Sequence, residues 1–331
     1  MTKYQKILGG LLAGAVGDAM GAATETRNMD QIIEKFGGLV TDFVDIPDDV
    51  FARGCPKGFV TDDFSLAYYT AWAIINNKGN IDDSVSKQAL INWSKSPYFS
   101  MAGPTTMAAI SKLKGEEVVD NLFHPAVENN KGTNGSAMKI APVGLASGGD
   151  VNKAIRDAIT ICKPTHFNNS SLAAACAVSA AVSAALKDDA DISDVMYAAF
   201  KGAQYGENQG IKLANPSVYS RIKLAYKIGI ENKGDLISAA KELNAVVGSG
   251  LAAYEAVPAA FGLLAALDGK PFDCIVAAVN MGNDTDTVAT IVGAIAGTLN
   301  GYWDERYLNI IDEVNGFDLQ KTARELALLN E

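Results

Sequence analysis

The chain has 331 residues, of which 48% are hydrophobic, and a formal net charge of −10 at pH 7. This composition allows a large buried core, and the negative charge argues against a surface that binds nucleic acid or anionic membranes. No run of residues reaches the roughly 18 to 20 apolar positions that a membrane-spanning helix needs. We therefore expect a soluble, cytoplasmic globular protein.

Helical patterns dominate the chain. Alanine-rich stretches with apolar residues at positions i, i+3 and i+4 recur along its length, and this spacing predicts helices. Only residues 40–46 alternate apolar and polar side chains, which indicates an irregular or short extended piece. We predict an all-α fold, a compact orthogonal helical bundle. The predicted helices cover residues 7–22, 63–77, 84–95, 104–113, 151–161, 169–187, 191–202, 217–228, 234–245, 251–267, 271–280, 287–299 and 317–329.

The N-terminal apolar run, residues 7–17, resembles the core of a signal peptide. However, four glycines interrupt it, and Gly17 and Asp18 stand where a cleavage site would be. We therefore predict a buried helix. Asp18 and Glu25 follow the run, and this stretch taken alone favours a helix-packing face followed by a solvated turn.

Two acidic segments open two apolar stretches at opposite ends of the chain. They contain Thr61, Asp62 and Asp63 before residues 64–75, and Asp284, Asp286 and Thr287 before residues 288–299. For either segment alone, N-capping of a helix is the simpler interpretation. Both together place several oxygen ligands at two helix starts, so we predict that these starts face each other and share hard metal ions. Such a site needs both ends of the chain, and we predict one domain spanning residues 1–331, although length alone suggests two.

The side chains of the two acidic segments offer only oxygen ligands, which suit Mg²⁺ or Mn²⁺. Four neighbouring carboxylates repel one another and raise some of their pKa values, and two divalent cations would neutralise them. Two such ions about 3.5–4 Å apart can bind vicinal hydroxyls and activate a water. A zinc site of the usual His/Cys type is not expected, because the chain has only two histidines, His124 and His166, and its four cysteines form no CxxC pair.

Two further loops carry polar residues. Residues 131–142 contain Gly-Thr-Asn-Gly-Ser before a helical stretch, a pattern that either presents backbone N–H groups to an anion or forms a plain turn. Residues 164–170 resemble an N-cap cluster, in which His166 would cap or pack. A Ser-His-Asp hydrolase and a cysteine nucleophile are less favoured, since no Gly-x-Ser-x-Gly elbow is present and no cysteine lies in an electropositive turn.

Six segments occur along the chain in a fixed order. They are Gly17–Gly21 with Glu25, Thr61–Asp63, Asn134–Pro142, Thr165–His166, Glu255–Ala260 and Asp284–Thr287. In this order they resemble the ADP-ribosylglycohydrolase family, which includes the hydrolase that reactivates dinitrogenase reductase and the crystallin-like relatives. The resemblance spans nearly the whole chain. It implies an all-α fold with two Mg²⁺ or Mn²⁺ ions at the centre of the bundle.

The resemblance also implies roles for particular residues. The metal ligands would be Thr61, Asp62, Asp63, Asp284, Asp286 and Thr287. The candidate general bases are Glu25 and Asp63, the turn of Asn134, Gly135 and Ser136 would face a diphosphate, and His166 would line the substrate cleft. The implied reaction is hydrolysis at the anomeric carbon of a ribose by a metal-activated water.

Two positions depart from the family pattern. Phe64 stands where a threonine is common and is expected to reshape the pocket, and Met101 replaces the aspartate of the nitrogenase-regulating branch. Both favour a small ribosyl or ADP-ribosyl substrate over an arginine-linked protein substrate. We therefore predict a dinuclear metal-dependent hydrolase of such a compound. Two alternatives stay open: a hydrolase of small nucleosides or other N-ribosides, and a crystallin-like binding protein without turnover, against which the complete ligand set counts.

Overall fold

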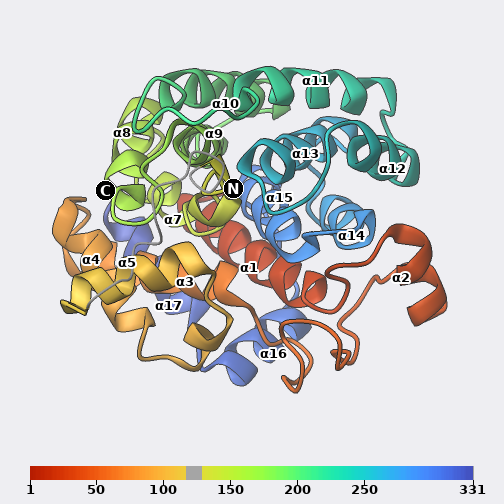
Figure 1. Cartoon of the computed structure of the whole chain (residues 1–331), viewed down its shortest axis with the longest axis horizontal. Helices are drawn as coiled ribbons and strands as arrows, with labels where there is room; N and C mark the ends of the chain where they lie inside the picture. Colours follow the sequence, from red (N-terminus) through yellow and green to blue (C-terminus); the bar gives the residue numbers. More distant parts are fainter. Residues whose placement is uncertain (117–128, 331) are drawn as a thin grey trace.

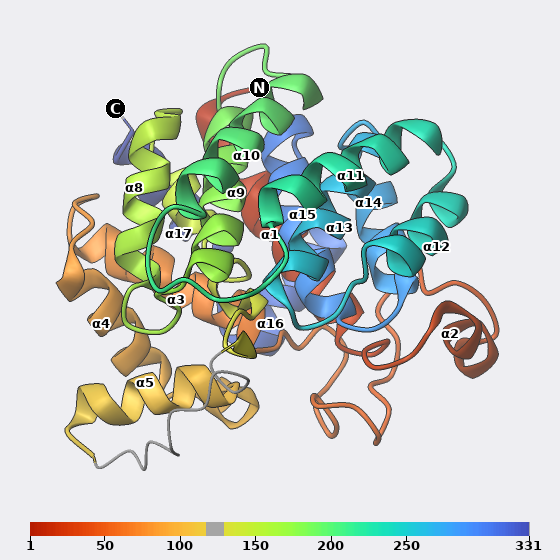
Figure 2. The same ribbon diagram turned by 45° about the horizontal axis from the view of Figure 1, so that its top comes forward.

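A computed structural model describes residues 1–116 and 129–330, and His124 lies outside them. The described residues form a bundle of helices without a β-strand, which confirms the predicted all-α fold (Figures 1 and 2). The α-helices are α1 (Lys3–Gly21), α2 (Met29–Phe36), α3 (Asp62–Asn76), α4 (Asp83–Trp93), α5 (Pro104–Lys114), α7 (Ala141–Leu145), α8 (Val151–Cys162), α9 (Asn169–Ala185), α10 (Ile192–Gly206), α11 (Val218–Glu231), α12 (Leu236–Val246), α13 (Ala253–Ala266), α14 (Pro271–Met281), α15 (Thr285–Asn300), α16 (Glu305–Asn315) and α17 (Leu319–Leu328). Two 3₁₀ helices, η1 (Pro97–Met101) and η2 (Asn134–Ser136), lie between them. Within the described ranges, none of the helices combines the length and the apolar character required to cross a bilayer.

Each predicted helix corresponds to an observed one, with ends that differ by a few residues. The apolar periodicity does not predict α2, α7 and α16. The first of these buries only Met29 and Ile32, and the second has five residues. Residues 40–46 contain neither a helix nor a strand, in agreement with the irregular piece that their pattern indicates.

Helices α1 and α15 pack side by side at the centre of the bundle, with the other helices around them (Figure 1). Every residue of α1 from Lys6 to Gly21 is buried, and so is every residue of α15 from Thr285 to Leu299. A helix that is apolar on all sides needs neighbours on all sides. The predicted N-terminal buried helix is therefore half of the central pair.

Glycines allow the backbones of α1 and α15 to touch. A Cβ atom on Gly17 would lie 2.3 Å from the carbonyl oxygen of Ala289, and one on Gly21 would lie 2.4 Å from the Cα of Asp286. On the other side, a Cβ on Gly293 would lie 2.2 Å from a carbonyl oxygen of α1. This close approach brings the C-terminal end of α1 against the N-terminal end of α15, where the second acidic segment lies.

We expect Gly17→Ala to lower the free energy of unfolding by about 1–3 kcal/mol, the usual effect of overpacking. The added methyl group would meet the backbone of Ala289, which cannot yield without separating the two central helices. Gly14→Ala is the matched control on the same helix, because its Cβ would lie 3.5 Å from its nearest neighbours, the side chains of Ala294 and Phe64. That variant should gain up to about 1 kcal/mol from helix propensity. Urea unfolding measures both, and a Gly17→Ala protein as stable as Gly14→Ala would contradict the packing argument.

Candidate active site

The two acidic segments begin α3 and α15, and the two helix starts are in direct contact. Thr61 caps α3 by accepting the backbone N–H of Asp63 at 3.2 Å. Asp284 directly precedes α15. Across the two starts, the hydroxyl of Thr287 donates to the carboxylate of Asp63 at 2.7 Å. Residues that are more than 200 positions apart in the sequence therefore form one site.

The loop after α1 is hydrogen-bonded to the segment that precedes α15. The N–H of Thr26 donates to the carbonyl of Asn283, and the N–H of Asn283 donates to the carbonyl of Arg27, both at 2.8 Å. Thr26 and Asn283 have positive φ angles of 65° and 67°. Asparagine adopts this conformation readily, but it is unusual for a β-branched residue, so Thr26 marks local strain beside the site. The turn that carries Glu25 is therefore buried against α15, and the prediction of a solvated turn is wrong.

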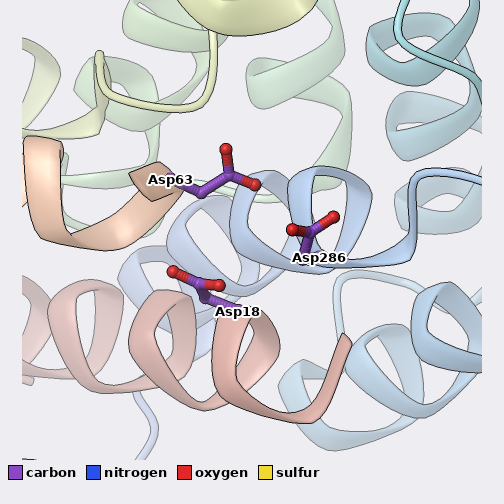
Figure 3. Close-up of side chains that lie close together, drawn as sticks. All are labelled: Asp18, Asp63 and Asp286. Carbon is purple, nitrogen blue, oxygen red and sulfur yellow. The ribbon is translucent and has the colours of Figure 1, made fainter. Parts of the chain in front are cut away.

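Two groups of carboxylates meet at Asp286. In the first, Asp18, Asp63 and Asp286 each offer one oxygen, and these oxygens lie within 4.8 Å of one another, on side chains that converge from α1, α3 and α15 (Figure 3). In the second group, Glu25, Asp284 and Asp286 do the same. All five side chains are buried. Asp286 thus belongs to both groups, and each group has the spacing of a cation site.

The carboxyl groups of the site retain protons more strongly than carboxyl groups in water. Burial raises the pKa of Asp18 and of Glu25 to about 7. Burial, reinforced by the charges of neighbouring carboxylates, raises the pKa values of Asp62, Asp63 and Asp286 well above the usual value. No lysine or arginine is among the described residues that line this site. Bound divalent cations would supply the missing positive charge and lower these pKa values.

Without divalent cations, we expect the protein to lose stability as the pH rises from about 5.5 to about 8. The folded state keeps protons on Asp18 and Glu25 up to about pH 7, whereas the unfolded chain releases them near pH 4. In this window the folded state binds more protons, so its stability falls with rising pH. Mn²⁺ at about a hundredfold excess over its Kd should add about 2.7 kcal/mol at the upper end. Thermal melting in EDTA and in Mn²⁺ measures both effects, and a melting temperature in EDTA that rises over this range would contradict the expectation.

Five carboxylates line a cavity of about 280 Å³, and Asp18 lies behind them, outside the lining. The five are Glu25, Asp62, Asp63, Asp284 and Asp286. Phe51 and Leu251 also line it and are 67% and 69% exposed, so apolar side chains stand at its mouth. Its other lining residues include the segment 101–106, with Met101, and the segment 133–135. The cavity therefore has a buried acidic end and an apolar entrance, a combination suited to a small ligand.

Asn134 and Gly135, two of the predicted substrate contacts, line the cavity, and Ser136 does not. The hydroxyl of Ser136 donates to the backbone carbonyl of Ser171 at 2.8 Å, away from the cavity. The side-chain amide of Asn134 donates to the carboxylate of Asp284 at 2.6 Å. The side chains of Asn134 and Ser136 therefore already donate within the protein, which leaves fewer donors for an anion than the motif predicts.

His166 also lines the cavity. Its Nε2 lies 3.0 Å from the hydroxyl oxygen of Thr133, and its Nδ1 is buried with no hydrogen-bond partner among the described residues. Burial, aided by the charge of Lys139, lowers the pKa of His166 well below its usual value, so the ring is neutral. A Cβ on Gly135 would lie 3.0 Å from Nε2, and glycine at that position leaves room for the imidazole.

Three residues occupy places that sequence analysis does not predict. Asp18 belongs to the first carboxylate group; it lies within the Gly17–Gly21 segment, but no role at the site is predicted for it. Asp62, a predicted ligand, is in neither group found among the described residues, although it lines the cavity. Phe64 does not line the cavity. Its ring is buried, with its centroid 6.1 Å from that of Phe317, so the expectation that it reshapes the pocket is wrong.

The fold and the site define an all-α protein with a carboxylate-lined cavity at its centre. A model of the ADP-ribosylglycohydrolase family matches residues 1–330, and the chain belongs to this family of glycohydrolases. The resemblance seen in the motifs is thereby confirmed.

Individual relatives cover most of the chain. The chain is 30% identical to the uncharacterized protein YegU of Escherichia coli (strain K12), over 98% of this chain and 97% of that protein. It is 25% identical to the ADP-ribosylhydrolase ARH3 of Homo sapiens, over 88% of this chain and 85% of that protein. A solved structure described as an ADP-ribosylglycohydrolase-related protein complex has the same fold, with a TM-score of 0.69 and 21% identity over 99% of both chains.

Proposed function

We propose that this protein is a hydrolase that depends on two divalent cations and cleaves the glycosidic bond at the ribose anomeric carbon of a small ADP-ribosyl compound. The observation that carries the proposal is the pair of carboxylate groups that share Asp286 at the inner end of the cavity. Membership of a glycohydrolase family supports the type of bond that is broken. The similarity to a protein named ADP-ribosylhydrolase ARH3 supports an ADP-ribosyl substrate.

The residues of the site fit Mg²⁺ or Mn²⁺. The donor set consists of oxygens, and hard divalent cations prefer oxygen. One oxygen of Glu25, Oε2, is buried without a hydrogen-bond partner in the described part of the chain, and a buried carboxylate oxygen needs a cation or a proton to offset its lost hydration. We assign the two ions to the predicted ligands Thr61, Asp62, Asp63, Asp284, Asp286 and Thr287, with Glu25 beside them.

Glu25 is the residue best placed to move a proton. When bound, the cations would polarise hydroxyl or water oxygens at this end of the cavity. Glu25 has an oxygen without a hydrogen-bond partner among the described residues. Bound cations would lower its raised pKa, so that the carboxylate is ionised and able to accept a proton. Asp63 is less suitable, because its Oδ2 accepts the hydroxyl of Thr287. Glu25 therefore accepts the proton of a water as the water oxygen bonds to the anomeric carbon and the leaving group departs with the electron pair of the glycosidic bond.

The entrance of the cavity favours a leaving group without a positive charge. Phe51, Met101, Pro104 and Leu251 contribute to its lining, and Phe51, Pro104 and Leu251 are exposed at the surface. A guanidinium group binds best to a carboxylate with which it forms two parallel hydrogen bonds. The four residues named here carry no carboxylate. We therefore infer that compounds in which ADP-ribose is linked through oxygen are hydrolysed faster than arginine-linked ones.

A second candidate function is the hydrolysis of small nucleosides. Three observations favour it: the hydroxyl of Ser136 donates to Ser171 away from the cavity, His166 is neutral, and the described lining residues include no lysine or arginine to bind a diphosphate. In that case the cations and Glu25 keep their roles, and only the part of the substrate beyond the ribose changes.

A hydrolysis screen tests the proposal. The purified protein is incubated with Mg²⁺ or Mn²⁺ and with O-acetyl-ADP-ribose, ADP-ribosyl-arginine, an ADP-ribosylated protein or nucleosides, and the products are separated by chromatography. We expect metal-dependent release of ADP-ribose, fastest from O-acetyl-ADP-ribose, and none from the Asp284→Ala/Asp286→Ala control. Release of ribose from nucleosides alone would favour the second candidate. Bound metal without any turnover would support the binding-protein alternative.

A further inference from the structure

We propose that Asp18 is a positioning residue: it holds the proton of the Thr61 hydroxyl, so that Thr61 presents a lone pair to the cation, and it is not itself a ligand. This inference rests on the proposed function, since it concerns the same cation site. It assigns a role to a buried carboxylate that lies outside the predicted ligand set.

The oxygens of Asp18 are occupied by donors at the start of α3. Oδ1 accepts the hydroxyl of Thr61 at 2.8 Å, and Oδ2 accepts the backbone N–H of Phe64 at 2.8 Å. The backbone N–H of Thr61 lies 3.1 Å and 3.0 Å from the two oxygens. A helix start has free N–H groups and a partial positive charge, both of which suit a carboxylate. Asp18 is 0% exposed, so solvent does not compete for these bonds.

The bond to Asp18 determines the orientation of the Thr61 hydroxyl. A hydroxyl has one proton and two lone pairs. Among the described residues, the other acceptor within reach of the proton is Oδ2 of Asp286 at 3.4 Å, so Asp18 at 2.8 Å is the stronger partner. One lone pair accepts the N–H of Asp63. The second lone pair is left for the cavity, which Thr61 lines.

A cation needs the lone pair of a hydroxyl and is repelled by its proton. Groups that hydrogen-bond to a ligand and fix its orientation commonly change metal affinity by about 10- to 100-fold. Asp18 also lies within 4.8 Å of the oxygens of Asp63 and Asp286, so direct ligation is the competing role. The two roles differ in one respect: a residue that acts through Thr61 has no effect once the Thr61 hydroxyl is gone.

A double-mutant cycle separates these roles. The Mn²⁺ affinity of the full chain is measured from the EPR signal of free Mn²⁺ for wild type, Asp18→Asn, Thr61→Val and the double variant. Asparagine keeps the volume of Asp18, but its single acceptor oxygen is needed by the backbone N–H groups of Thr61 and Phe64, so that its NH₂ group faces the Thr61 hydroxyl. Valine keeps the shape of Thr61. We expect each single variant to bind about 10- to 100-fold more weakly, and the double variant to differ from Thr61→Val by no more than about twofold. Thr61→Ser, which keeps the hydroxyl, should bind like wild type.

Losses that multiply in the double variant would show that Asp18 is a ligand and would overturn the inference. Wild-type affinity in Asp18→Asn would overturn it as well. If Asp18→Asn does not fold, Thr61→Val carries the test, because wild-type affinity in that variant would mean that there is no hydroxyl ligand to position. A wild-type protein that binds no Mn²⁺ would overturn the proposed function itself, whereas the other contrary results leave that function intact.

Discussion

Replacing Asp286 with alanine is expected to remove Mn²⁺-dependent hydrolysis, with kcat/KM lowered by more than about 100-fold, the upper end of the effect of losing a supporting group around a metal. The reason is that Asp286 is shared by both carboxylate groups, whereas Asp284 belongs to one. Asp284→Ala should therefore keep more activity than Asp286→Ala at the same Mn²⁺ concentration. Steady-state kinetics over a range of Mn²⁺ concentrations measure the difference.

Thr290→Val is the matched control for Asp286→Ala. Thr290 lies one turn further along α15 and is buried, and its hydroxyl oxygen has no hydrogen-bond partner within residues 1–116 and 129–330. It does not line the cavity. Valine keeps its shape, so we expect kcat/KM and the melting temperature to stay at or above the wild-type values. An Asp286→Ala protein that is as active as this control would show that the shared carboxylate is not required.

Glu25→Gln is expected to lower kcat by about 10²- to 10⁴-fold, the usual contribution of a general base. Glutamine keeps an oxygen for a cation but cannot accept a proton, so Mn²⁺ affinity should fall less than kcat. A base acts when it is deprotonated, so wild-type kcat/KM should rise with pH through the pKa of Glu25. That pKa is about 7 without ions and lower with cations bound. Glu25→Gln should lose this limb of the profile.

The control for Glu25→Gln is Glu34→Gln, an exposed carboxylate on α2. It should keep both the rate and the pH profile. Full kcat in Glu25→Gln would exclude Glu25 as the base. If Asp63→Asn still binds Mn²⁺ but its kcat/KM no longer rises with pH, Asp63 is the general base.

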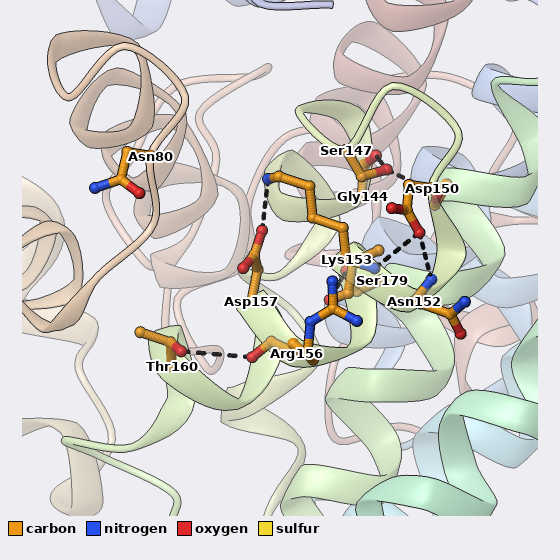
Figure 4. Close-up of polar contacts among 12 residues, drawn as sticks. Asn80, Gly144, Ser147, Asp150, Asn152, Lys153, Arg156, Asp157, Thr160 and Ser179 are labelled. Atoms are coloured by element: carbon orange, nitrogen blue, oxygen red, sulfur yellow. Dashed lines mark hydrogen bonds and ion pairs between the residues drawn. The ribbon is translucent and has the colours of Figure 1, made fainter.

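Local signals explain why most helices are predictable from the sequence. At α8, the carboxylate of Asp150 accepts the backbone N–H groups of Asn152 and Lys153 at 2.9 Å and 3.0 Å, and Lys153 pairs with Asp157 one turn later at 2.6 Å (Figure 4). A cap residue followed by apolar periodicity is readable without knowledge of the fold. Helix α16 carries similar signals, a cap at Asp304 and a buried stripe of Tyr307, Leu308 and Ile311, although the apolar periodicity alone does not predict it.

The site is only partly predictable, for a physical reason. Residues such as Asp63 and Asp286 form recognisable motifs because each stands next to a helix start. The partner of Asp18, Thr61, lies 43 positions away at the start of α3, and sequence spacing does not reveal the packing of α3 against α1 that joins them. The direction of the Ser136 side chain likewise depends on how η2 packs against α9.

A count of bound Mn²⁺ ions per chain is the sharpest test of a two-cation centre built around Asp286. Equilibrium dialysis followed by metal analysis gives this number for wild type, Asp284→Ala and Asp286→Ala. We predict two ions for the wild-type protein, one for Asp284→Ala and none for Asp286→Ala. A single ion in the wild type, or two ions retained in Asp286→Ala, would contradict the shared centre.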